Sequence, residues 1–254
     1  MVLAIDIGNT NIVVGCFNGD KLTFIERIST NQSGTTLEHV VMFKTILEIH
    51  GIKAVDVDGG IISSVVPSIT SAVKEAAETI IKKKILVLGP GVKTGLSILI
   101  DDPAQLGSDL VAGAVAGINL YKAPMLIIDI GTATTISVIN EKKQYLGGLI
   151  VPGPKVSLES LVSRTSQLPK ISLEAPKKVI GSNTIDCMKS GIIYSNAAIL
   201  DGIIERVENE LNSKCTAIAT GGLSKVIVPY CNHHIEINDE LLLEGLIVIY
   251  NKNK

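Results

Sequence analysis

Apolar and polar residues alternate along the chain in segments that switch between the period of a strand and the period of a helix. Apolar runs or two-residue alternation predict strands over residues 2–7, 11–17, 21–28, 59–66, 85–88, 125–130, 135–140, 144–150, 215–219 and 233–237, with a short extended piece over 96–100. Helical spacing predicts helices over residues 35–50, 67–84, 102–121, 152–164, 184–212 and 239–250. This mixture predicts an α/β protein.

One helix start is marked by its capping residues. Asp102 is followed by Pro103 and, three residues after the cap, by Gln105. This order is typical of a helix N-terminus, where a carboxylate accepts from a free N–H group and proline fits the first turn. We therefore expect the helix to begin at Asp102 and to continue to about Tyr121.

The chain contains an internal repeat. The segment of residues 6–15, Asp-Ile-Gly-Asn-Thr-Asn-Ile-Val-Val-Gly, is matched 123 residues later by Asp-Ile-Gly-Thr-Ala-Thr-Thr-Ile-Ser-Val at 129–138. Each copy predicts a strand, an Asp-x-Gly turn and a second strand. We expect two similar halves, residues 1–114 and 115–254, each a sheet with helices, and a binding cleft between them.

Composition narrows the function classes. Hydrophobic residues make up 46% of the chain and aromatic residues only 3%, with no Trp, so the core is aliphatic. So few rings exclude a stacking platform for single-stranded nucleic acid, and a net charge of −2 gives no basic surface for DNA or RNA. No apolar run approaches the roughly 18 residues of a membrane span, and no basic stretch precedes the first strand as in a signal peptide.

Cysteine and histidine positions give no metal or disulfide pattern. The four cysteines lie far apart without a Cys-x-x-Cys pair, which indicates reduced thiols in a cytoplasmic protein. His233 and His234 are adjacent, but neighbouring strand residues point to opposite faces and suit shared metal ligation poorly.

The two Asp-x-Gly turns have residue types that suit phosphate and cations. In the first, Gly8 exposes backbone N–H groups, and Asp6 at the strand end suits Mg²⁺ rather than direct contact with phosphate. In the second, Asp129 suits a cation and Gly131 allows the bend. The side-chain donors are Asn9, Thr10 and Asn11 in the first turn, and Thr132, Thr134 and Thr135 in the second. Two ordinary polar hairpins would contain similar residues, but the match half a chain apart favours a ligand site.

Two further segments add candidate chemistry. Phosphoryl transfer to an alcohol needs a carboxylate near the acceptor hydroxyl, and Asp109 can supply it. Asp109 is equally explained as an acidic residue early in a helix, where the helix dipole favours it. The segment Thr-Gly-Gly-Leu-Ser at 220–224 would let an adenosine lie against bare backbone, or is a simple glycine turn. No Walker motif is present, which excludes a P-loop enzyme.

Together these segments resemble the type III pantothenate kinases, within the acetate and sugar kinase/actin-like ATPase superfamily. The resemblance covers essentially the whole chain, through motifs at residues 6–10, 107–109, 129–134, 147–153, 167–169, 181–184 and 220–224. It implies two actin-like (ribonuclease H-like) lobes with a cleft between them. It also implies a homodimer that phosphorylates the hydroxyl of pantothenate with ATP, the first step of coenzyme A synthesis.

The resemblance implies roles for individual residues. Asp109 would be the base, and Asp129 would help bind a monovalent cation, K⁺ or NH₄⁺. Thr132 would contact ATP, and Thr184 would reach the substrate from the other subunit. Mg²⁺ and the ATP phosphates would be held by Asp6, Ile7, Gly8, Asn9, Thr10, Asn11, Ile12 and Val13, the nucleoside would lie near 220–224 with Gly221 and Gly222, and the acceptor would lie near Gly107, Ser108, Asp109 and Leu110.

The chain departs from the family pattern on the acceptor side. The family's Gly-Ala-Asp-Arg stands here as Gly-Ser-Asp-Leu at 107–110, and a Tyr nine residues before the Asp is replaced by Ile100. Arginine is a fork of donors suited to an anion, and pantothenate is a carboxylate. Lys93 or Arg164 are alternative sources of that charge.

Three rival functions stay open from the sequence. They are a paralogue acting on another small alcohol, a nucleotide-binding regulator without turnover, and an ATPase or phosphatase of the same superfamily. The retained carboxylates of Asp6, Asp109 and Asp129 argue against loss of catalysis, and Leu110 argues for a changed acceptor.

Overall fold

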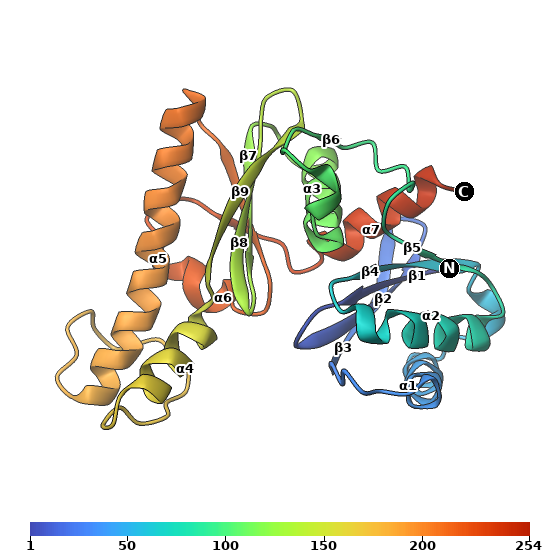
Figure 1. The fold of residues 1–254 in the computed structure, drawn as a ribbon, viewed down its shortest axis with the longest axis horizontal. Coiled ribbons are helices and arrows are strands. Elements are labelled where there is room, and N and C mark those ends of the chain that lie inside the picture. The colour runs from blue at the N-terminus through green and yellow to red at the C-terminus, as the bar shows by residue number, and fades with distance from the viewer. The chain divides into compact units, whose positions relative to one another are not determined.

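The sequence repeat folds into two units, each built on its own sheet. The computed structural model describes all residues from 1 to 254. The first unit comprises residues 1–96, 102–116 and 241–254, and the second comprises 97–101 and 117–240 (Figure 1). This division differs from the expected halves, 1–114 and 115–254, chiefly at helix α7 (Leu241–Lys252). The apolar face of α7 is buried against β1 and β4, so the chain end returns to the N-terminal sheet.

The sheet of the first unit has the strand order β3-β2-β1-β4-β5. Its strands are β1 (Val2–Ile7), β2 (Asn11–Asn18), β3 (Lys21–Ser29), β4 (Gly59–Ser64) and β5 (Ile85–Val87). The first three form an antiparallel meander, and β4 and β5 continue the sheet parallel to β1. The register between β1 and β4 places Asp6 beside Ser63 and Ile7 beside Ser64.

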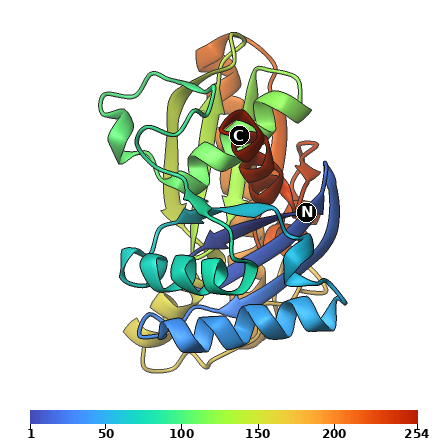
Figure 2. The same ribbon diagram turned by 90° about the vertical axis from the view of Figure 1, so that its right-hand side faces the viewer.

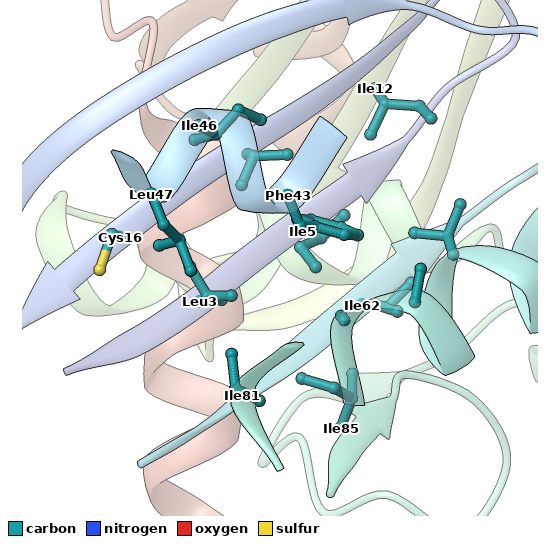
Figure 3. Packing of buried hydrophobic residues seen from close by; sticks show 14 of the residues in the cluster. Leu3, Ile5, Ile12, Cys16, Phe43, Ile46, Leu47, Ile62, Ile81 and Ile85 are labelled. Carbon is teal, nitrogen blue, oxygen red and sulfur yellow. The ribbon is translucent and has the colours of Figure 1, made fainter. Parts of the chain in front are cut away.

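Helices cover both faces of this sheet. Helices α1 (Thr36–Ile49) and α2 (Pro67–Ile81) lie side by side on one face, and α7 lies on the other (Figures 1 and 2). Leu3 and Ile5 pack with Phe43 and Leu47 in a hydrophobic core under α1 and α2 (Figure 3). Because successive strand residues point to opposite faces, Asp6 belongs to the face that α7 covers.

The second sheet repeats this topology. Its order is β11-β10-β7-β8-β9-β6, in which a meander of three strands is again followed by two parallel strands. The strands are β6 (Ser97–Ile98), β7 (Met125–Ile130), β8 (Ala133–Ile139), β9 (Gln144–Pro152), β10 (Thr216–Thr220) and β11 (Glu236–Ile237). β6 adds an edge strand parallel to β9. The prediction of an α/β chain with two similar actin-like lobes is confirmed.

A long helix covers one face of the second sheet. Helix α5 (Thr184–Leu211) packs Ile193, Leu200 and Ile204 against β7 residues Leu126 and Ile128. By strand alternation Asp129 belongs to the opposite face. The shorter elements of the chain are α4 (Pro154–Arg164), α6 (Ser224–Ile227), and the 3₁₀ turns η1 (Ala54–Asp56) and η3 (Val228–Tyr230). No helix combines the length and the apolar composition that a membrane crossing requires.

The prediction of one helix from Asp102 to Tyr121 is wrong at its start. Asp102 does act as a cap, accepting from the N–H of Ala104 at 3.1 Å, but it caps only the 3₁₀ turn η2 (Pro103–Gln105). Leu106 then adopts an extended backbone conformation, with φ −71° and ψ 120°. Helix α3 (Ser108–Leu120) therefore starts anew, two residues after a break that the capping pattern did not reveal.

The predicted strand at 233–237 is also shorter, since only Glu236 and Ile237 pair with β10. The N–H groups of Asn232 and His233 donate instead to the carboxylate of Asp201, at 2.8 and 2.9 Å, and His233 Nδ1 lies 3.0 Å from the same carboxylate. Burial alone would raise the pKa of Asp201. These hydrogen bonds outweigh it and hold that pKa below its ordinary value. His233 thus anchors a loop.

Candidate active site

In the first Asp-x-Gly turn, the backbone N–H of the glycine makes a hydrogen bond within the turn. The N–H of Gly8 donates to the carbonyl oxygen of Asn11 at 2.9 Å and closes the hairpin, and Thr30 Oγ1 donates to the carbonyl of Gly8 at 2.6 Å. The N–H of Gly8 itself is therefore not among the backbone donors that this turn can offer to phosphate. The exposed side chains of Asn9 and Asn11 leave amide donors at the tip of the turn.

The neighbours of this turn divide between surface and core. Asp6 is half-buried at the end of β1, and Thr10 is exposed. Ile7 and Ile12 are at most 1% exposed, so their side chains belong to the core and only their backbone faces the turn. Val13 is half-buried and pairs with Asp6 across the hairpin.

The second turn is one residue shorter than the first. Asp129 pairs with Thr135, and the N–H of Gly131 donates to the carbonyl of Ala133 at 3.0 Å. Of the three threonine hydroxyls of this turn, that of Thr132 lies at the tip, where the residue is exposed. Thr134 is 2% exposed inside β8, so its hydroxyl does not lie at the exposed tip with that of Thr132. The two copies match residue by residue only as far as the glycine.

Two other motifs fold against this second turn. The N–H of Gly153 donates to the carbonyl of Thr132 at 3.1 Å, and a Cβ at residue 153 would overlap the carbonyl oxygens of Gly131 and Thr132. A Cβ at residue 221 would overlap Asp129 Oδ1. The segments 129–134, 147–153 and 220–224, which are far apart in sequence, therefore meet at the second turn.

Gly221 has a structural reason to be glycine. Its φ is +88°, and a Cβ there would lie 2.8 Å from both N and O of Ile130 as well as against Asp129. On β10, the preceding Thr220 is the register partner of Asp129, and Ser224 Oγ donates to the carbonyl of Gly221 at 2.8 Å. Gly222 is exposed and has no positive φ.

Asp109 lies in the first turn of α3. Its Oδ1 accepts from the N–H of Leu110 at 2.8 Å. Gly107 leaves room for this arrangement, because a Cβ there would overlap the same oxygen. Burial raises the pKa of Asp109, and the N–H groups of Leu110 and of Asp109 itself offset only part of that rise. A carboxylate with a raised pKa is the stronger proton acceptor that general base catalysis needs.

The start of α3 is joined to the strand end that neighbours Asp6. The hydroxyl of Ser108 lies 3.0 Å from that of Ser63, and Ser63 is the register partner of Asp6. Asp6 and the segment 107–109 therefore belong to one face of the first sheet. Ser63 cannot be found from the sequence, because the register between β1 and β4 has no local signal there.

The donor sets of both turns fit cations. Asp6 offers carboxylate oxygens on the face that also carries Ser63, and Asp129 offers them beside Thr220. Such oxygen-only sets are what hard cations prefer.

The remaining candidates lie at element ends. Leu110 is half-buried on α3, and Ile100 follows β6 with its Cγ2 3.9 Å from the Cβ position of Gly147. Thr184 is exposed at the first residue of α5, whose cap Asn183 accepts from the N–H of Asp186 at 2.9 Å. The backbone N–H of Lys93 donates to Asn253 at 3.0 Å, and Arg164 is exposed at the end of α4.

Comparison with known proteins identifies the family. The model of the family "type III pantothenate kinase" matches residues 2–206. A type III pantothenate kinase of Bacillus cytotoxicus is 42% identical over 253 residues, covering 100% of this chain and 97% of the relative. One of an Exiguobacterium species is 42% identical over 254 residues, covering 100% of both.

A solved structure shares the fold. A protein of Campylobacter jejuni described as a Baf family transcriptional activator superposes with a TM-score of 0.58 at 20% identity, covering 99% of this chain and 98% of its own. The family match and the full-length identity to the two kinases establish that this chain belongs to the type III pantothenate kinase family.

Proposed function

We propose that this chain transfers the γ-phosphoryl group of ATP to the hydroxyl of pantothenate, the first step of coenzyme A synthesis. The observation that carries this proposal is the 42% identity, along the whole chain, to relatives named type III pantothenate kinase. The retained carboxylates of Asp6, Asp109 and Asp129 support an active enzyme, since each lies at the end of a strand or the start of a helix in its unit.

Asp109 acts on the acceptor in this proposal. As the acceptor oxygen attacks the γ-phosphorus, a new O–P bond forms and the bond from phosphorus to the bridging oxygen breaks. ADP leaves with that electron pair, and the hydroxyl proton passes to the carboxylate of Asp109. The raised pKa of Asp109 suits this role.

Each Asp-x-Gly turn has donors that suit the phosphates of the nucleotide. Asn9 and Asn11 donate to phosphate oxygens from the first turn, and Thr132 donates from the second. Asp6 would hold Mg²⁺ and Asp129 a monovalent cation, both fitting their oxygen donors. When bound, Mg²⁺ would neutralise negative charge on the phosphates. The backbone at Gly221 and Gly222 borders the nucleoside.

We propose further that the active form is a cytoplasmic homodimer. In it, Thr184 of one subunit reaches the substrate of the other. The exposed position of Thr184 at the start of α5 supports a contact outside its own chain.

One experiment separates the proposal from its rivals. ADP formation is followed with purified protein in K⁺, with and without pantothenate, and the product is identified by mass spectrometry. Pantothenate-dependent ADP with phosphopantothenate supports the proposal. ADP at the same rate without acceptor indicates an ATPase, and nucleotide binding without ADP indicates a regulator. Turnover only with another small alcohol, the outcome that Leu110 favours, indicates a changed acceptor.

Turnover is expected to depend on the monovalent cation. A cation at Asp129 would add a charge-assisted contact to phosphate, worth about 1.5 to 3 kcal/mol, or about tenfold or more in rate. We expect K⁺ or NH₄⁺ to support turnover and Na⁺ to support much less. Rates in K⁺, Na⁺ and tetramethylammonium chloride at one ionic strength check this, with Asp129→Asn as the variant that should lose the preference. Equal wild-type rates in all three salts would contradict it.

Leu110→Arg is expected to lower KM for pantothenate more than it changes kcat. An Arg after the base would contact the carboxylate both before and during transfer, and such uniform binding appears in KM. A charge-assisted contact of about 1.5 to 3 kcal/mol corresponds to roughly 10- to 150-fold in affinity. Leu110 is only half-buried, so a long polar side chain can leave the core. Steady-state kinetics with a melting curve test this; a folded variant with unchanged KM means that another group binds the carboxylate.

A further inference from the structure

The hydroxyl of Ser108 ties the first residue of α3 to the end of β4. It accepts from the N–H of Ser64 at 2.9 Å and donates to the carbonyl of Ser64 at 3.0 Å. It also lies 3.0 Å from the hydroxyl of Ser63, which is fully buried. All three contacts lie within the first unit.

These contacts use the full hydrogen-bonding capacity of the hydroxyl. A serine hydroxyl has one proton to donate and two lone pairs that accept. The proton goes to the carbonyl of Ser64, and the lone pairs take the N–H of Ser64 and the hydroxyl proton of Ser63. The hydroxyl has no hydrogen bond left to offer a substrate. The side chain of Ser108 therefore joins two segments of the same chain.

The hydrogen bonds of Ser108 to Ser63 and Ser64, which we call the tie, connect the start of α3 with the end of β4. On one side, Ser108 directly precedes Asp109. On the other, Ser63 and Ser64 lie beside Asp6 and Ile7 in the parallel register of β4 with β1. The N–H of the next residue after β4, Val65, donates to the carbonyl of Ile7 at 3.0 Å and extends this contact. The Ser108 hydroxyl therefore links the residue next to Asp109 to the strand that pairs with the end of β1.

We propose that Ser108 is a positioning residue, which sets the place of the Asp109 carboxylate relative to the strand end that carries Asp6. The inference rests on the proposed function for its kinetic consequence, but the tie itself does not. An alanine at this position contains no atom that can make these bonds.

The first test replaces Ser108 by Ala. Misplacement of a reacting group by about 1 Å costs up to about 100-fold in rate, so we expect Ser108→Ala to lower kcat by about 10- to 100-fold with KM for ATP changed less than threefold. Ser108→Thr, which keeps the hydroxyl, should recover most of kcat. A kcat of Ser108→Ala within twofold of wild type would overturn the proposal.

A matched control lies at the same strand end. The side chain of Ser64 bonds to Thr70 Oγ1 at 2.7 Å and to the N–H of Val66 at 3.1 Å, so it holds α2 rather than α3. Ser64→Ala removes the same atom and a similar number of hydrogen bonds. It should lower the melting temperature to a similar extent while kcat stays within twofold of wild type. An equal fall of kcat in both variants would mean general loosening and would overturn the proposal.

A double variant separates positioning from plain loss of stability. If Ser108 acts through Asp109, Ser108→Ala should lower kcat less than threefold further in an Asp109→Asn background, because the group it positions is already disabled. A full 10- to 100-fold further loss would overturn the proposal.

Amide hydrogen exchange gives a readout that needs no substrate. We expect about tenfold or faster exchange at residues 108–112 in Ser108→Ala and at residues 66–70 in Ser64→Ala. Unchanged exchange at the start of α3 would mean that the hydrogen bonds of Ser108 do not hold this helix end, and it would overturn the proposal. Wild-type protein that makes no phosphopantothenate would instead refute the proposed function, and the exchange result would still decide the inference about Ser108.

Discussion

Asp109→Asn is expected to lower kcat for phosphoryl transfer by about 10²- to 10⁴-fold, the usual contribution of a general base. The amide keeps the size of the side chain and can still accept from the N–H of Leu110, which lies 2.8 Å from Oδ1 in the wild type. It loses the ability to take a proton. Turnover of the variant within threefold of wild type would remove Asp109 from the mechanism.

The same variant should be as stable as wild type or more so at neutral pH. Burial raises the pKa of Asp109 in the folded state, so folding favours the protonated carboxyl. Stability therefore falls as pH rises through the ordinary and then the raised pKa, and at neutral pH the buried charge is a cost. Asn carries no charge and avoids this cost. A melting curve at neutral pH checks the expectation that the temperature does not fall.

The pH profile of wild-type kcat should also show the raised pKa of Asp109. The base works only when deprotonated, so kcat should fall on the acid side of a pKa above the ordinary value of an aspartate. Asp102→Asn is the matched control, because Asp102 is an exposed carboxylate that caps a neighbouring turn. It should leave this limb of the profile unchanged, and a shift of equal size in this variant would point to a general charge effect.

Gly221→Ala is expected to destabilise the protein by about 2 to 5 kcal/mol. A left-handed backbone costs a residue with a Cβ about 1 to 2 kcal/mol, and an overpacked site costs typically about 1 to 3 kcal/mol. Both apply, since φ is +88° and the Cβ would overlap Asp129 Oδ1. For a chain of this size the melting temperature should fall by about 4 to 20 °C. Displacement of Asp129 should also lower kcat/KM for ATP by about 10- to 100-fold.

Gly91 offers a control with the same backbone conformation. Its φ is also +88°, but no atom lies within 4 Å of its Cβ position. Gly91→Ala should therefore show only the conformational cost, a fall of about 2 to 8 °C, with kcat/KM unchanged. Equal losses of stability in the two variants would mean that the contact with Asp129 contributes nothing.

Local sequence patterns are enough to predict the elements and their repetition. Two-residue alternation and helical spacing are local properties, so most strands and helices were predicted near their true bounds. The repeated Asp-x-Gly segment predicted that β7 and β8 would copy β1 and β2, and the same topology in both sheets confirms it. The family followed from an ordered set of motifs, because short segments of fixed sequence are visible without a structure.

The way in which those segments meet depends on contacts between distant residues and is visible in the structure alone. The place of α7 on the N-terminal sheet, the register that sets Ser63 beside Asp6, and the contact of Gly221 with Asp129 all join residues far apart in the chain. Such contacts depend on which strands pair and on the space between packed atoms, and neither leaves a local pattern. The sequence marks Gly221 as a place where a ligand can approach the backbone, and the structure adds a second reason for glycine, since a Cβ there would overlap Asp129 Oδ1.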